Sequence, residues 1–100
     1  MIRSFRNKDT QAVFRGEFVK GLDRQIQQRV RERLKYLDGA LDLRDLMIPP
    51  SNQLEPLKGD RQGQYSIRIS KQWRLCFRWK DGDAFEVENR GLPLRMFSRE

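Results

Sequence analysis

The hydrophobic pattern of this chain changes its period near the middle, and that change limits the folds open to it. The apolar residues of the first half recur at helical spacing, at Leu22, Ile26, Val30, Leu34 and Leu37. From Tyr65 onward apolar and polar residues alternate, which is the two-residue period of a half-buried strand. Helices followed by a run of strands predict an α+β fold, with the helices on one face of an antiparallel sheet.

Capping and turn residues predict where these elements begin and end. Residues 1–5 alternate weakly, which is typical of a short strand, and Asp9 is the expected N-cap of a helix over 10–14. Asp38-Gly39 is expected to end the long helix that begins near Leu22. The prolines that follow Ile48 predict a stiff connector over 48–52.

The second half predicts a meander of short strands. Tyr65, Ile67 and Ile69 share one face, and Trp73, Leu75, Phe77 and Trp79 share the same face of the next strand. Asp81-Gly82-Asp83 predicts a hairpin into a last strand, in which Phe85 and Val87 alternate with Glu86 and Glu88. The aromatic row invites a role in base stacking, but its spacing is more simply that of a strand's core face.

Length and charge point to one small domain with an anionic partner. One hundred residues, 37% of them hydrophobic, are expected to form a single domain over 1–100. The net charge of +7 favours RNA, DNA, a ribosome or an acidic protein segment as partner. A purely solubilising role for the charge is the alternative.

Several classes of protein are disfavoured. No apolar run is long enough for a membrane span, and residues 1–6 do not resemble a secretory signal. The single cysteine, Cys76, fits a reducing cytoplasm and is expected to be a small buried hydrophobe. A single cysteine without any histidine can form neither a Cys-His nucleophile pair nor a thiol-rich zinc site, and no cofactor or metal is expected.

Metal-independent cleavage of RNA by attack of a 2′-hydroxyl remains open to such a chain. It needs a proton acceptor, a proton donor and cations that stabilise the crowded phosphate. The candidate cations lie in the basic loop at Lys58–Arg61 and in the strand-like segments that follow it, and Glu55 is the nearby carboxylate that can act as a base. The candidate nucleic-acid-binding residues are Lys58, Arg61, Arg68, Lys71 and Arg74. For each of them, a solvated strand residue or a salt-bridge partner is the simpler alternative.

Four segments together give a family resemblance. They are Met1-Ile-Arg-Ser-Phe5, Leu54-x-Pro-Leu-Lys-Gly-Asp-Arg61, Ser66-Ile67 and Trp73-Arg-Leu-Cys-Phe77. In order and spacing they resemble the HigB-like (plasmid killer) toxins of the RelE/ParE superfamily. The resemblance implies two or three N-terminal helices packed on an antiparallel sheet, and a bacterial type II toxin that cuts mRNA in the ribosomal A site. It places Lys58 and Arg74 at cationic active-site positions, and Glu55 where some members have a histidine.

The resemblance also implies partners. They are a cognate HigA-like antitoxin, the ribosome with its mRNA, and operator DNA reached only through the antitoxin complex. No membrane partner is expected, and the expected location is the cytoplasm. The alternatives are a catalytically inactive relic that binds its antitoxin and acts in operon autoregulation, and a ParE-like gyrase inhibitor.

The chain departs from the family pattern after Glu88. Members usually end in an Asp-Tyr-His-like segment that supplies acid–base groups, whereas residues 89–100 contain neither tyrosine nor histidine. This tail is atypical, and a frame shift is one hypothesis for it. One base inserted after a glutamate codon converts codons for Ile-Val-Asp-Tyr-His into codons for Asn-Arg-Gly-Leu-Pro, the residues found at 89–93. Gly91 and Pro93 predict that the last strand ends early, and activity is expected to be weak.

Overall fold

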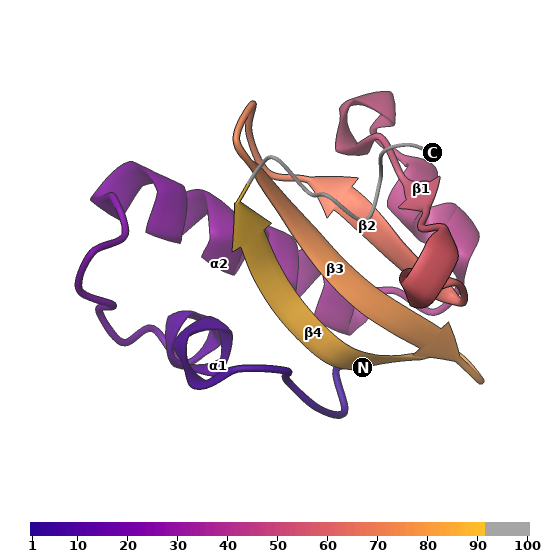
Figure 1. Cartoon of the computed structure of the whole chain (residues 1–100), viewed down its shortest axis with the longest axis horizontal. Helices are drawn as coiled ribbons and strands as arrows, with labels where there is room; N and C mark the ends of the chain where they lie inside the picture. Colours follow the sequence, from indigo (N-terminus) through magenta and orange to yellow (C-terminus); the bar gives the residue numbers. More distant parts are fainter. Residues whose placement is uncertain (92–100) are drawn as a thin grey trace.

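The computed structural model describes residues 1–91, and it has two layers, helices on one side and a sheet on the other (Figure 1). The helices are α1 (Lys8–Phe14) and α2 (Arg24–Gly39). The strands are β1 (Glu55–Pro56), β2 (Gln64–Arg68), β3 (Trp73–Lys80) and β4 (Asp83–Gly91). The strands lie in the order β1-β2-β3-β4, and every neighbouring pair is antiparallel. The predicted α+β fold is confirmed.

Helix α2 forms where the apolar stripe predicted it. Its N-cap is Asp23, whose carboxylate accepts a hydrogen bond from the backbone N–H of Ile26 at 3.3 Å. Val30, Leu34 and Leu37 are fully buried against the sheet residues Ile67, Leu75, Phe77 and Val87, which form the other half of the core. Leu22 lies in the turn before the helix, because the cap at Asp23 sets the first helical residue.

The predicted cap of the first helix is wrong. Asn7, not Asp9, is the N-cap of α1, and its side-chain oxygen accepts a hydrogen bond from the backbone N–H of Thr10 at 2.9 Å. Asn7 has the extended backbone that a cap requires, whereas Asp9 already lies in the first helical turn.

The N-terminal segment pairs with the sheet more loosely than a strand. Ile2 and Phe5 form isolated parallel bridges to Ala84 and Val87. The backbone N–H of Arg3 donates to the carbonyl of Ala84 at 2.7 Å, so the segment covers the outer edge of β4.

Between α2 and β2 the chain forms short 3₁₀ turns rather than a plain stiff connector. They cover Leu43–Met47, Pro50–Asn52 and Gly59–Arg61. The buried Asn52 donates from its amide to the carbonyl of Leu46 at 3.1 Å and so holds the first two turns together. Gln53 follows with a left-handed φ of 47°, which turns the chain into β1.

The predicted alternation within the last strand is also wrong. Phe85 pairs with Arg78, and Glu88 pairs with Cys76, so Glu86 and Val87 both lie opposite Phe77. This is the two-against-one count of a β-bulge, and Glu86 adopts a φ of 53° there. The extra residue puts Phe85 on the opposite face from Val87.

Strand β4 continues to Gly91 instead of ending early. Gly91 pairs with Trp73, and a Cβ placed on Gly91 would lie 3.3 Å from the indole ring. The glycine thus lets the ring lie against the backbone, which is why it is tolerated in the strand. The rest of the atypical tail, residues 92–100, lies outside the described residues. Within residues 1–91 no helix has the length and apolar character needed to cross a bilayer.

Candidate nucleic-acid interface

One face of the sheet carries the helices, and the other face, called the outer face below, is polar. The strand register puts its side chains in rows that run across the sheet. The outer face includes Glu55 from β1, Gln64, Ser66 and Arg68 from β2, Arg74, Cys76 and Arg78 from β3, and Glu88 and Arg90 from β4. Because of the bulge, Phe85 also lies on this face, opposite Arg78. The predicted core row lies on the helix side, where Phe77 is fully buried and Trp73 and Trp79 are partly buried.

Arg74 lies near the centre of the outer face and is held in place by three groups. Its Nε donates to Ser66 Oγ at 2.8 Å, and its Nη2 donates to the carbonyl oxygen of Gln53 at 2.5 Å. The Glu55 carboxylate lies 3.7 Å from Nη2. A guanidinium fixed in this way keeps its orientation when a phosphate approaches, because little side-chain entropy is left to lose.

Burial makes the charge on Arg74 costly. The residue is only 7% exposed, and desolvation lowers the pKa of its guanidinium. The Glu55 carboxylate opposes that shift, and the neighbouring Arg68 cation adds to it. The group remains a cation at neutral pH because the ordinary pKa of arginine is so high.

Glu88 is the centre of a second group of charges on the outer face. Its Oε1 lies 2.6 Å from Arg61 Nη1, 3.6 Å from Arg6 Nε and 3.7 Å from Arg90 Nη1. Glu88 is 5% exposed and Arg61 is 8% exposed, so this pair is largely removed from water. The pair attaches the turn at Gly59–Arg61 to β4, and in this arrangement the Arg61 guanidinium faces Glu88.

The other candidate residues lie around the two ends of this face. Lys58 is exposed and begins the turn that Arg61 holds over the sheet. Arg68 on β2 lies opposite Arg74 on β3 in the strand register, and Lys71 is exposed in the turn that joins those strands. Glu55 is exposed at the sheet edge. The fold therefore gathers Glu55, Arg68 and Arg74, with Lys58 and Lys71 at opposite ends of β2.

Cys76 lies in the middle of the outer face and is fully buried, as predicted. Burial raises the pKa of its thiol from 9.0 to about 11, and the Glu88 carboxylate adds to the rise. The thiol is therefore neutral at physiological pH and does not act as a nucleophile.

We expect Cys76 to resist thiol reagents in the folded protein and to react readily after denaturation. A raised thiol pKa favours folding while the unfolded thiol is neutral. The contribution of Cys76 to the free energy of unfolding is therefore complete below pH 9.0, and it is lost as the pH rises to about 11. Urea unfolding across that range should show a smaller pH-dependent loss in Cys76→Ala than in the parent chain. Equal losses in both chains would contradict the assignment.

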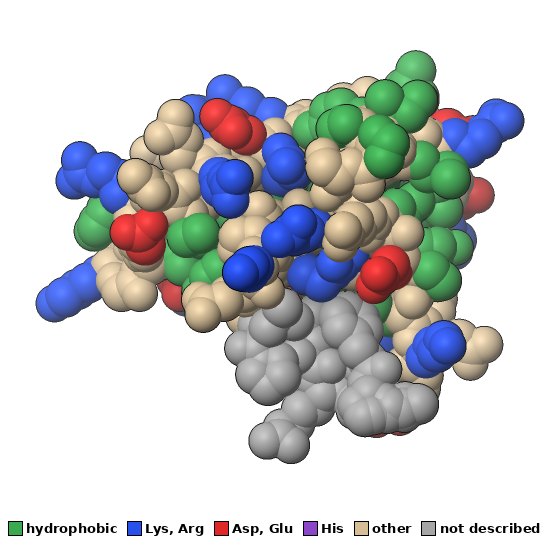
Figure 2. Space-filling model, turned by 90° about the horizontal axis from the view of Figure 1, so that it is seen from above, with side chains coloured by type: hydrophobic (Ala, Val, Ile, Leu, Met, Phe, Trp, Pro, Cys, Tyr) green, Lys and Arg blue, Asp and Glu red, His purple; other side chains and the backbone are tan. Residues whose placement is uncertain are grey.

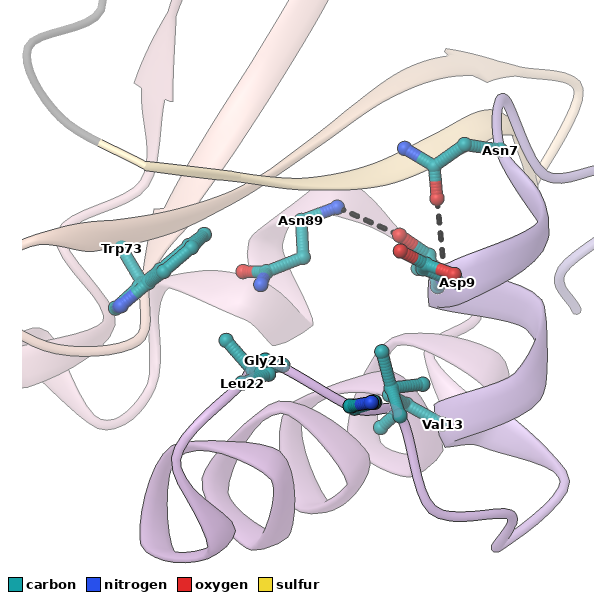
Figure 3. A pocket seen from close by; sticks show the side chains of 10 residues that line it. Asn7, Asp9, Val13, Gly21, Leu22, Trp73 and Asn89 are labelled. Atoms are coloured by element: carbon teal, nitrogen blue, oxygen red, sulfur yellow. Dashed lines mark hydrogen bonds between the residues drawn. The ribbon is translucent and has the colours of Figure 1, made fainter.

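A separate hollow lies on the helix side of the sheet, between α1, the loop after it and the end of β4 (Figure 3). Its volume is about 220 Å³. Asn89 points into it from β4 with Trp73 beside it, while its backbone N–H donates to Thr10 Oγ1 at 3.0 Å. The sheet separates this hollow from Arg74, so it does not belong to the candidate interface.

Sequence reasoning missed the acidic centre of the interface. Glu88 and Arg61 are far apart in the sequence, and only the register of three strands brings them together. Ser66 was noted as part of a motif but not as the group that orients Arg74. Once the register is known, the alternation of Gln64, Ser66 and Arg68 places Ser66 on the same face as Arg74. Among residues 1–91 no cluster of acidic or cysteine side chains has the make-up of a metal site.

Comparison with known proteins adds a family match and close relatives. The family described as RelE-like toxin of type II toxin-antitoxin system HigB matches residues 3–89. Endoribonuclease HigB of Proteus vulgaris is 35% identical over 85 residues, which cover 85% of this chain and 91% of that protein. Toxin HigB-1 of Vibrio cholerae is 46% identical over 62 residues, which cover 62% of this chain and 65% of that protein.

Solved structures share the fold at low sequence identity. YafQ of E. coli superposes with a TM-score of 0.59 at 14% identity, over 92% of each chain. The YoeB-YefM complex of Staphylococcus aureus gives a TM-score of 0.56 at 20% identity, over 90% of this chain and 95% of that one. These likenesses confirm the predicted RelE/ParE-like arrangement of helices on an antiparallel sheet.

Proposed function

This chain belongs to the HigB-like family of RelE-like toxins of type II toxin-antitoxin systems, and from that premise we propose that it is a ribosome-dependent mRNA endonuclease. It would inhibit translation by cutting mRNA in the ribosomal A site, at an activity reduced by the missing tyrosine and histidine. The name of the Proteus vulgaris relative, an endoribonuclease, supports the reaction class. The proposed site of action is the cytoplasm, with no cofactor.

The observation that carries this proposal is the fixed guanidinium of Arg74 on a polar sheet face. Ser66 and Gln53 orient it, so it can meet the extra negative charge on a phosphate under attack without first reorganising. Lys58, exposed on its turn, would contact the same backbone as a mobile point charge. Arg68 and Lys71 would extend the contact along β2, and Arg61 would hold the turn in place through Glu88.

Proton transfer is the weak part of this site. Glu55, near Arg74 and in contact with water, is the proposed acceptor of the 2′-hydroxyl proton. The two tyrosines are Tyr36 and Tyr65, and histidine is absent, so the sequence after Glu88 offers no tyrosine or histidine as proton donor. The loss of a general acid or base typically lowers a rate by about a hundredfold to ten-thousandfold.

A second candidate function follows from the same absence. A chain that keeps its cations but lacks its proton donor can persist as a binding module. It would capture a HigA-like antitoxin and act with it at operator DNA in operon autoregulation. The toxin in the staphylococcal YoeB-YefM complex is a fold neighbour, which supports an antitoxin as partner here.

We expect induction of this chain without its antitoxin to give weak cleavage of translated mRNA, detected by primer extension. Arg74→Gln should lower that cleavage by roughly tenfold to a hundredfold, the range for loss of a charged hydrogen bond. Lys58→Gln should act in the same direction, whereas Lys80→Gln, which removes an exposed cation at the other end of β3, should leave cleavage unchanged.

The outcomes separate the candidate functions. No cleavage with retained antitoxin binding would favour the binding module. Inhibition in a supercoiling assay would instead indicate a gyrase inhibitor. Strong growth arrest that Arg74→Gln abolishes would contradict the proposed loss of activity.

A further inference from the structure

A hollow of about 290 Å³ lies where α2 meets the β2–β3 turn, beyond the edge of the outer face. Four cations line it, Arg29 and Arg33 from α2, Arg68 from β2 and Lys71 from the turn. The other lining residues within 1–91 are Ser51, Ile69 and Ser70, so no carboxylate of this range lines it. Figure 2 looks onto the end of the molecule that carries this turn, and Lys and Arg side chains gather near the centre of the view.

These four cations, Arg68 included, differ from the other arginines of the outer face in their surroundings. Among residues 1–91, none of the four forms a salt bridge, whereas Arg61, Arg74 and Arg78 each lie within 4 Å of a glutamate. Like charges brought together without a counter-ion repel one another, and that repulsion is relieved when an anion binds. The cluster therefore has the electrostatics of an anion site.

The two arginines of α2 are directed toward the turn by backbone contacts. Arg33 Nε lies 3.3 Å from the carbonyl oxygen of Arg68, and Arg29 Nη1 lies 3.5 Å from that of Ile69. Each contact engages one N–H, and a guanidinium carries five, so most of the donors remain for a ligand. The spacing of Arg29 and Arg33, one helical turn apart, places both on the same side of α2.

We propose that this hollow is a second phosphate-binding site, which takes the ribophosphate backbone of RNA beyond the sheet. Arg68 connects the two sites, since it lines the hollow and is also the cross-strand partner of Arg74 on the outer face. An RNA strand bound at Arg74 would pass Arg68, cross the β2–β3 turn and reach Arg29 and Arg33. The inference deepens the proposed function and rests on it for the identity of the anion as RNA.

The lining favours a phosphate backbone over an acidic peptide. Protein segments that bind tightly usually bury an apolar or aromatic anchor. In the part of the chain that the structure describes, Ile69, itself 3% exposed, is the only apolar residue that lines the hollow. Phosphates need no such anchor, because they bind through charge and through N–H and O–H donors. Arginine, lysine and serine side chains supply those donors here.

The test measures binding of the purified chain to a labelled, unstructured oligouridylate by fluorescence anisotropy at several salt concentrations. We expect Arg29→Gln/Arg33→Gln to weaken binding by roughly threefold to thirtyfold. The slope of the logarithm of the binding constant against the logarithm of the salt concentration should fall by the amount that corresponds to about one to two phosphate contacts. A short RNA hairpin serves as a second probe. Stronger loss on the oligouridylate assigns the site to single-stranded mRNA, and stronger loss on the hairpin assigns it to folded ribosomal RNA.

Two matched variants keep the result interpretable. Arg29→Lys/Arg33→Lys retains the charge and should lose less binding than the Arg→Gln pair, because lysine also binds phosphate, as a point charge. Arg15→Gln/Lys35→Gln removes the same charge from exposed positions outside the hollow and should have little effect. If the Arg→Gln pair does not fold, Lys71→Gln in the exposed turn tests the same site.

Three results would overturn the inference. They are unchanged RNA binding in the Arg→Gln pair, an equal loss in the Arg15/Lys35 control, and stronger competition by polyglutamate than by oligouridylate. None of these measurements depends on cleavage, so the proposed endonuclease activity can fail while this site stands, and the reverse is also true.

Discussion

Replacing residues 89–93 with Ile-Val-Asp-Tyr-His, and ending the chain there, is expected to raise the rate of translation-dependent mRNA cleavage by roughly a hundredfold to ten-thousandfold. The physical reason is that the replacement supplies a proton donor to a site whose cations are proposed to bind phosphate. Primer extension on translated mRNA and single-turnover cleavage on programmed ribosomes measure the effect. In the proposed site, Arg74 would stabilise the phosphate while the added groups transfer protons.

A matched replacement tests whether the acid–base groups are responsible. In the sequence Ile-Val-Asp-Phe-Gln, phenylalanine and glutamine keep the approximate shape of the tyrosine and histidine that they replace. Neither of these two side chains can exchange protons at neutral pH. It should leave cleavage at the level of the parent chain. An equal gain from both replacements would mean that the length or packing of the tail limits the reaction. The frame-shift hypothesis has its own check, because the gene must contain codons for tyrosine and histidine one base out of frame.

Glu88→Gln is expected to lower the free energy of unfolding by about 3–5 kcal/mol, the range for removing one partner of a buried ion pair. Arg61 would remain buried beside Gln64 without a carboxylate, and Arg6 and Arg90 would lose their shared neighbour. Urea denaturation followed by circular dichroism measures the change. Because Arg61 holds the turn that begins at Lys58, RNA binding should weaken as well.

Glu86→Gln is the matched control for this prediction. Glu86 also contacts two arginines, Arg6 and Arg78, at 3.3 Å each, but all three side chains are 44–45% exposed. Exposed pairs of this kind contribute about 0–1 kcal/mol. A similar loss of stability in both variants would show that burial does not strengthen the dependence of Arg61 on Glu88.

Local patterns predicted the elements whose formation depends on nearby residues. The stripe from Ile26 to Leu37 and the alternation from Tyr65 to Trp79 were both confirmed, since each reflects one buried face. The N-cap of α1 was a local error, since Asn7 and Asp9 are both capping residue types two positions apart. The errors in β4 concern features set by partners distant in sequence. The bulge at Glu86 depends on its pairing with β3, and the length of β4 depends on the ring of Trp73.

The candidate interface was predictable only in part, for the same reason. A basic loop and a Trp-Arg pair indicated Lys58 and Arg74, but their surroundings depend on strand register. Ser66 reaches Arg74 because β2 and β3 pair as they do, and Glu88 reaches Arg61 across two intervening strands. The cluster around Arg29 and Arg33 joins a helix to a turn, so it could not be found from either segment alone.

The contact between Gly91 and Trp73 sets one structural condition for reversion of the tail. Under the frame-shift hypothesis, position 91 held an aspartate, whose Cβ would now lie 3.3 Å from the indole ring. Few Cβ atoms come so close to a neighbour, so the ring would have to shift by a few tenths of an ångström to accommodate the older residue. Under the same hypothesis, a return of the tyrosine and histidine therefore brings with it a small adjustment at Trp73, on the helix side of the sheet.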